Sequence, residues 1–122
     1  MDNFISYLDK IESLVKAKQY DKAWSIANEG LIKIKGEDRY MMYYQMAEIV
    51  AREKKWFDAL EKMGFVIYYL KSLGGTSHKK FVLRLLKKFK KEDLLEEYVR
   101  LSERTHPRDL NPRLKTLLEI EA

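Results

Sequence analysis

A seven-residue segment of this chain recurs after 36 residues, and this spacing restricts the possible folds more than any other feature. The two copies are residues 18–24 and 54–60, and each places an aromatic side chain three positions before an alanine. A second step of the same length reaches residues 90–96, where Glu92 stands in the aromatic position and Leu95 in the alanine position. Such a period is typical of proteins built from repeated supersecondary units. The sequence therefore predicts two clear copies of one unit and a degraded third.

Apolar residues at helical spacing flank each copy, which predicts a pair of amphipathic helices per unit. Gly36 and the pair at 74–75 follow the second and fourth helices, where glycine readily adopts the left-handed conformation that ends a helix. Thr76 or Ser77 is then expected to cap the fifth helix. The short connections make successive helices antiparallel neighbours. The expected helices span about 3–17, 21–35, 39–53, 57–72, 78–90 and 93–105.

The turn segments resemble those of tetratricopeptide repeats, in which an aromatic residue precedes an alanine at the hairpin turn and a small residue lies in the first helix. The matching positions are Tyr20, Ala23, Ala47, Trp56, Ala59 and the closing proline, Pro107. The chain departs from the pattern by placing Ile11 and Leu83 at the small position and Lys10 at an apolar one.

The resemblance implies an all-α fold in which three antiparallel hairpins stack as a short right-handed solenoid. A single domain over residues 1–122 would then contain repeats at about 3–36, 39–74 and 77–107. A capping helix at about 112–121 is expected to follow, with Asn111 as its N-cap and Pro112 at its first position. The alternative that fits the same apolar stripes is an irregular bundle of six or seven helices.

The residue inventory argues against an enzyme, a metal site and a bound cofactor. The chain has no cysteine, and neither of its two histidines, His78 and His106, has a partner at metal-ligand spacing. We expect both histidines to lie at the surface or to cap helices. No nucleophile motif, phosphate loop or nucleotide fingerprint is present. The acidic pairs at 92–93 and 96–97 suit a helix N-terminus.

Composition also restricts the cellular location that we expect for the protein. The balance of 46% hydrophobic and 35% charged residues is that of a globular chain. No apolar run approaches the roughly 18 residues that span a bilayer, and the N-terminus lacks the pattern of a signal peptide. We therefore expect a cytoplasmic protein without a membrane partner. Abundant Lys and Glu with few Asn and Gln are typical of hyperthermophiles, whereas the five Met argue against that origin.

The least ordinary feature is residues 79–91, which carry seven lysines and arginines and no acidic residue. At helical spacing, five of these cations fall on one side, opposite an apolar stripe. One interpretation is a solvated face whose lysine stems cover apolar surface. Another is a binding face for an acidic partner. The cations of this face are Lys80, Arg84, Lys87, Lys88 and Lys91.

The tetratricopeptide resemblance implies that the inner helices line a concave groove, apolar near residues 5–15 and basic near residues 80–88. Such a groove suits a protein segment that combines apolar and acidic residues. In family members that bind chaperone C-termini, lysines and asparagines grip the terminal carboxylate, but Glu12 and Glu48 stand at the asparagine positions here. The residues expected to bind are Ile5, Leu8, Met41, Tyr44, Arg52, Lys80, Arg84, Lys87 and Lys88.

Two other partners fit parts of the pattern. The apolar residues near the N-terminus can instead be covered by a second copy of the chain, as a homodimer, or by the C-terminal helix. The pI of about 9.3 and the lysines of residues 79–91 also allow binding to the phosphate backbone of nucleic acid. A protein segment is the leading hypothesis, and nucleic acid is the alternative.

Overall fold

The computed structural model describes residues 4–120 and shows an all-α protein, which confirms the predicted fold class. These residues contain no β-strand, and none of their helices is long and apolar enough to cross a membrane. Two 3-10 turns, η1 (Gly36–Asp38) and η2 (Glu92–Leu94), interrupt the helical sequence. The helices are α1 (Phe4–Lys16), α2 (Tyr20–Lys33), α3 (Arg39–Arg52), α4 (Trp56–Leu70), α5 (Thr76–Lys87), α6 (Leu95–Arg104) and α7 (Pro107–Leu117).

The same turn closes α1, α3 and α5, at intervals of 36 residues. Lys18, Lys54 and Lys90 each adopt a left-handed conformation, with φ values of 59°, 63° and 60°. In each turn the lysine N–H donates to a carbonyl three residues back, and the next N–H donates to a carbonyl five residues back. This is the Schellman arrangement, here with lysine where glycine is usual. The period seen in the sequence is thus a period in backbone geometry, and it includes the third copy.

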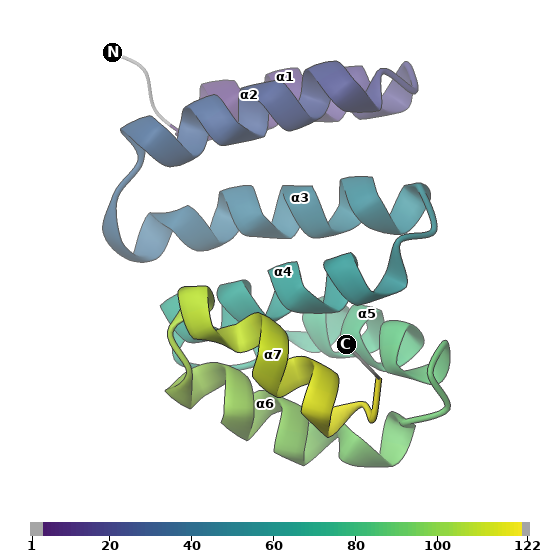
Figure 1. Ribbon diagram of the computed structural model, residues 1–122. Helices are drawn as coiled ribbons and strands as arrows, with labels where there is room; N and C mark the ends of the chain where they lie inside the picture. The colour runs from purple at the N-terminus through teal and green to yellow at the C-terminus, as the bar shows by residue number, and fades with distance from the viewer. Residues whose placement is uncertain (1–3, 121–122) are drawn as a thin grey trace.

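Two apolar clusters form the core. One lies among α1, α2 and α3 and includes Tyr7, Ile11, Ala27 and Met42. The larger one surrounds α4, which packs against α3, α5, α6 and α7. In Figure 1 the α1–α2 pair lies above α3, and α4 lies below α3 with the last three helices around it. The helices of the first half of the chain therefore form layers, whereas those of the second half surround α4.

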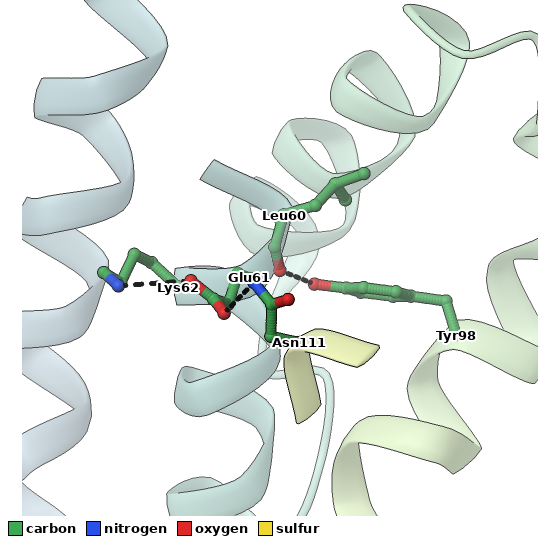
Figure 2. A network of polar contacts seen from close by, with 5 residues as sticks. All are labelled: Leu60, Glu61, Lys62, Tyr98 and Asn111. Carbon is green, nitrogen blue, oxygen red and sulfur yellow. Dashed lines mark hydrogen bonds and ion pairs between the residues drawn. The ribbon is translucent and has the colours of Figure 1, made fainter. Parts of the chain in front are cut away.

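Polar contacts link α4 to both of the last two helices (Figure 2). The buried hydroxyl of Tyr98 on α6 donates to the Leu60 carbonyl of α4 at 2.5 Å. Asn111 on α7 donates through its side-chain amide to the Glu61 carboxylate at 2.9 Å, and Lys62 lies 3.4 Å from the same carboxylate. The Tyr98 and Asn111 bonds, which join residues 38 and 50 positions apart in the sequence, fix how α6 and α7 lie against α4.

Gly64 explains how α6 and α7 approach α4 so closely. It is buried in α4, and a Cβ atom there would lie 2.5 Å from Leu110 Cδ2 and 3.1 Å from Ser102 Oγ. A larger side chain would therefore push both neighbouring helices outward. Gly64 therefore determines how closely α6 and α7 approach α4. The 36-residue repeat gives no indication of this contact.

Several expected boundaries are wrong. The last helix begins at Pro107, not at residue 112, because His106 caps it and Leu110 and Leu114 bury one face of it. Pro112 consequently lies inside α7, and Asn111 bonds to Glu61 rather than capping a helix.

The ends of α5 also differ from the expected ones. The N-cap of α5 is Gly75, without a side-chain hydrogen bond, so neither Thr76 nor Ser77 caps that helix. The helix stops at Lys87, because the left-handed turn at Lys90 follows at once. Lys91 consequently lies beyond the helix, where it pairs with Glu119 at 2.7 Å.

The last three helices depart from the first two hairpins. α6 begins three residues later than the repeat would place it, because η2 occupies the positions that start α2 and α4 in the earlier copies. α7 packs on α4 and α6, on the opposite side of α3 from α1 (Figure 1), so it does not cover the apolar residues near the N-terminus. The right-handed stacking of three hairpins stays a prediction, and the irregular bundle stays its alternative.

Candidate functional site

A groove with a volume of about 570 Å³ lies between α3 and α5 and is closed at one end by the first residue of α4. It joins cationic, aromatic and aliphatic side chains in one concave surface, which we call the α3–α5 groove. Its lining residues are Tyr44, Glu48, Ala51, Arg52, Trp56, Ser77, Lys80, Phe81, Arg84, Leu85 and Lys88.

Helical spacing explains why these side chains converge. On α5, the cations at 80, 84 and 88 recur every fourth residue and so follow one side of the helix and its end. Val82, Leu85 and Leu86 of α5 are buried, and their packing turns the side with the cations toward α3 and the solvent. On α3, the lining residues at 44, 48 and 52 follow the same spacing, while Met42, Met46 and Ile49 are buried. Two amphipathic helices thus present their polar stripes to each other.

Aromatic contacts fix the floor and one end of the groove. The ring of Tyr44 stacks on His78 at 4.7 Å between centroids and meets Phe81 edge-on at 5.9 Å. Phe81 is only 5% exposed, so it belongs mainly to the core. At the other end, Lys88 Nζ lies 4.7 Å from the centre of the Trp56 ring, within cation–π range. Arg84 Cζ similarly lies 5.2 Å from the centre of the Phe81 ring, so two of the groove cations contact its aromatic rings.

The electrostatic balance of the groove is positive but not uniform. Its lining contains four cations, Arg52, Lys80, Arg84 and Lys88, and one carboxylate, that of Glu48. Burial raises the pKa of Glu48, and the charges of Arg52 and then Arg84 oppose that rise. The pKa of Tyr44 is also raised, first by burial and then by the nearby Glu48 charge.

The structure brings together five of the nine residues expected to bind: Tyr44, Arg52, Lys80, Arg84 and Lys88. The other four lie outside the groove lining. Ile5 is 55% exposed on α1, and Leu8 and Met41 pack against the N-terminal apolar cluster. Lys87 is exposed on α5 next to the lining residue Lys88. The single groove expected to join an apolar and a basic end therefore stays a prediction.

The basic segment 79–91 does not form one continuous face. Three of its cations line the α3–α5 groove, whereas Lys79 lines a separate hollow between α5 and α6. Lys91 pairs with Glu119, as described above. Lys87 and Lys90 are exposed elsewhere. The charge that looked like a single feature in the sequence is divided among several sites.

Six lining residues were not among the nine expected binding residues: Glu48, Ala51, Trp56, Ser77, Phe81 and Leu85. Trp56 was attributed to the repeated turn, although as the first residue of α4 it also reaches the groove. Phe81 sits four residues before one of the aliphatic residues of the same stripe, which marks it as core. The tetratricopeptide resemblance already places Glu48 at a groove position, and the structure puts it in the lining.

The two histidines have local structural roles. His106 caps α7, where its Nδ1 accepts a hydrogen bond from the Arg108 N–H at 3.2 Å, which confirms a capping role. His78 is half-buried in the first turn of α5 and stacks on Tyr44. Across residues 4–120, no three acidic, histidine or cysteine side chains gather in a way that could hold a metal ion.

Comparison of the chain with protein-family models, curated proteins and solved structures gives no match. The tetratricopeptide resemblance consequently rests on the residues of the repeat alone. Function has to be inferred from the groove itself.

Proposed function

We propose that this protein is a non-catalytic, cytoplasmic interaction scaffold that binds an acidic protein segment with apolar residues in the α3–α5 groove. The observation that carries the proposal is the lining, in which four cations surround aromatic and aliphatic side chains. Long-range attraction to the cations speeds the encounter with an acidic segment, and apolar burial slows its release.

The dimensions of the groove support a protein segment as the ligand. It is formed by two helices over the length from Tyr44 to Arg52 on α3 and from Ser77 to Lys88 on α5. Along the groove, cations stand beside apolar side chains, among which Ala51 and Trp56 are partly exposed. A short peptide with a large apolar side chain between acidic residues fits this alternation of surfaces.

Adjacent lysines provide a matched test. Lys88 lines the groove and Lys87 does not, although both are exposed and carry the same charge. We expect Lys88→Glu to weaken binding of an acidic peptide roughly tenfold or more, because it reverses a charge that the ligand contacts. Lys87→Glu changes the net charge equally but should weaken binding by only about twofold at physiological salt, where distant charges are screened.

The measurement is fluorescence anisotropy with a labelled peptide in which one leucine stands between two pairs of glutamates. Circular dichroism establishes that both variants are folded. Equal losses in the two variants would mean that only net charge matters, and the groove would then not be the binding site. Failure of the wild-type protein to bind the peptide even at low salt would remove the proposed function.

A further inference from the structure

Glu48 is an unexpected residue in a groove for acidic ligands. It lies on α3 one turn from Tyr44 and one turn from Arg52, and among the described lining residues it is the one carboxylate. A negatively charged ligand that follows the groove must pass beside it. The position therefore has consequences for which anionic ligands can enter.

Building on the proposed function, we propose that Glu48 selects peptide over nucleic acid in this groove. A peptide carries backbone N–H donors between its acidic side chains, so it can donate to Glu48 while its carboxylates meet the surrounding cations. The phosphodiester backbone of a DNA strand offers only acceptors. The backbone of a strand that enters the groove brings negative charge to the carboxylate, with no donor between the phosphates to compensate.

The surroundings of Glu48 make this discrimination effective. The side chain is half-buried, so water screens its charge less than that of a fully exposed carboxylate. Arg52 and Arg84 act on it electrostatically in favour of the charged form, and Glu12 acts against it. A carboxylate has about four lone-pair directions, so it can accept N–H groups from a ligand.

Aromatic residues of the groove are also poorly placed for bases. Proteins that bind single strands offer exposed aromatic faces on which bases stack. Here Phe81 is 5% exposed, and Tyr44 is stacked on His78. Trp56 has the ammonium group of Lys88 over its ring. A base would have to displace one of these contacts, whereas an aliphatic side chain can lie against the partly exposed Ala51 without doing so.

The test compares the labelled glutamate–leucine peptide with a labelled oligothymidylate of the same charge, each titrated into wild-type protein and Glu48→Gln. Glutamine keeps the size of the side chain and an acceptor oxygen but removes the charge. Glu97→Gln, at an exposed position in the first turn of α6, makes the same change in net charge away from the groove. The quantity compared is the Kd for the oligothymidylate divided by the Kd for the peptide.

We expect the wild-type protein to prefer the peptide and Glu48→Gln to lower the ratio by roughly five- to tenfold, mainly by tightening oligothymidylate binding. Glu97→Gln should leave the ratio unchanged within about twofold. If the wild-type protein binds the peptide and both variants leave the ratio unchanged, Glu48 is not the selective residue, although the proposed function stands. If the wild-type protein prefers the oligothymidylate, the choice of a peptide partner is itself wrong.

Discussion

Replacing Tyr98 by phenylalanine tests how α6 is held against α4. The side chain is fully buried, and its hydroxyl donates to the Leu60 carbonyl, 38 residues earlier in the chain. Phenylalanine keeps the ring and removes that bond. A buried hydrogen bond contributes about 1 kcal/mol net, and the small space left by the hydroxyl adds to the loss, so we expect Tyr98→Phe to lower the free energy of unfolding by about 1–2 kcal/mol.

That loss is measurable as a lower melting temperature. Unfolding entropy scales with chain length, so for 122 residues each kcal/mol corresponds to about 4 °C, and Tm should fall by about 4–8 °C. Tyr20→Phe is the matched control, because Tyr20 is only half-buried at the start of α2. Its loss of a hydroxyl should change Tm by less than about 2 °C.

The pH dependence of the free energy of unfolding gives a second test of the burial of Tyr98. Burial raises the pKa of Tyr98 above the ordinary tyrosine value of 10.0. Above about pH 10 the unfolded chain loses this proton while the folded chain keeps it, so the unfolded state binds fewer protons and stability falls as pH rises. The slope from this one group is about 1.4 kcal/mol per pH unit.

Tyr98→Phe lacks that contribution, so the two proteins should become equally stable roughly one pH unit above pH 10. Urea denaturation at pH 8, 10 and 11 measures the difference directly. A gap between wild type and variant that stays constant over this range would show that Tyr98 ionises as freely in the folded protein as in the unfolded one. The account of its burial would then be wrong.

The remaining predictions concern backbone conformation. Gly74 has a φ of 84° and a Cβ there would meet a neighbouring ring at 2.4 Å, so Gly74→Ala should destabilise the protein by about 1–2 kcal/mol in urea denaturation. Gly75→Ala, where a Cβ meets nothing within 4 Å and φ is negative, should change stability by less than half of that; equal losses would contradict this explanation. Lys54→Gly should raise stability by about 0.5–1 kcal/mol, because glycine adopts the left-handed turn without steric penalty, and a loss in the same assay would mean that the lysine side chain stabilises the turn.

Local signals in the sequence predicted most of the helices. Apolar periodicity located all seven approximately, and the recurrence at 18–24, 54–60 and 90–96 marked turns that share one backbone geometry. These features depend on residues close together in the chain. The predicted start of α7 was wrong because the sequence has two candidate starts, 106–107 and 111–112. In each, a possible N-cap residue precedes a proline at the first helical position. Long-range burial of Leu110 against α4 decides between them.

The candidate site was only partly predictable for a related reason. Helical spacing identified the cations of α5, and the tetratricopeptide resemblance implied Tyr44 and Arg52 on α3; these residues do converge. Spacing alone could not exclude Lys87, which is adjacent to Lys88 but falls outside the lining, nor separate Ile5 from the basic groove. Those distinctions depend on the angle between helices, which the contacts of α4 with its four neighbours determine.

The central position of α4 has a consequence for how the protein opens. Within the described residues, α1 contacts only α2 and α3 to a substantial extent, whereas α4 contacts helices on both sides. Amide hydrogens in α1 can therefore exchange through a local opening that leaves the larger apolar cluster intact. Those in α4 exchange only when most of the molecule unfolds. Because the α3–α5 groove rests on that larger cluster, it would keep its shape during fraying of the N-terminal pair.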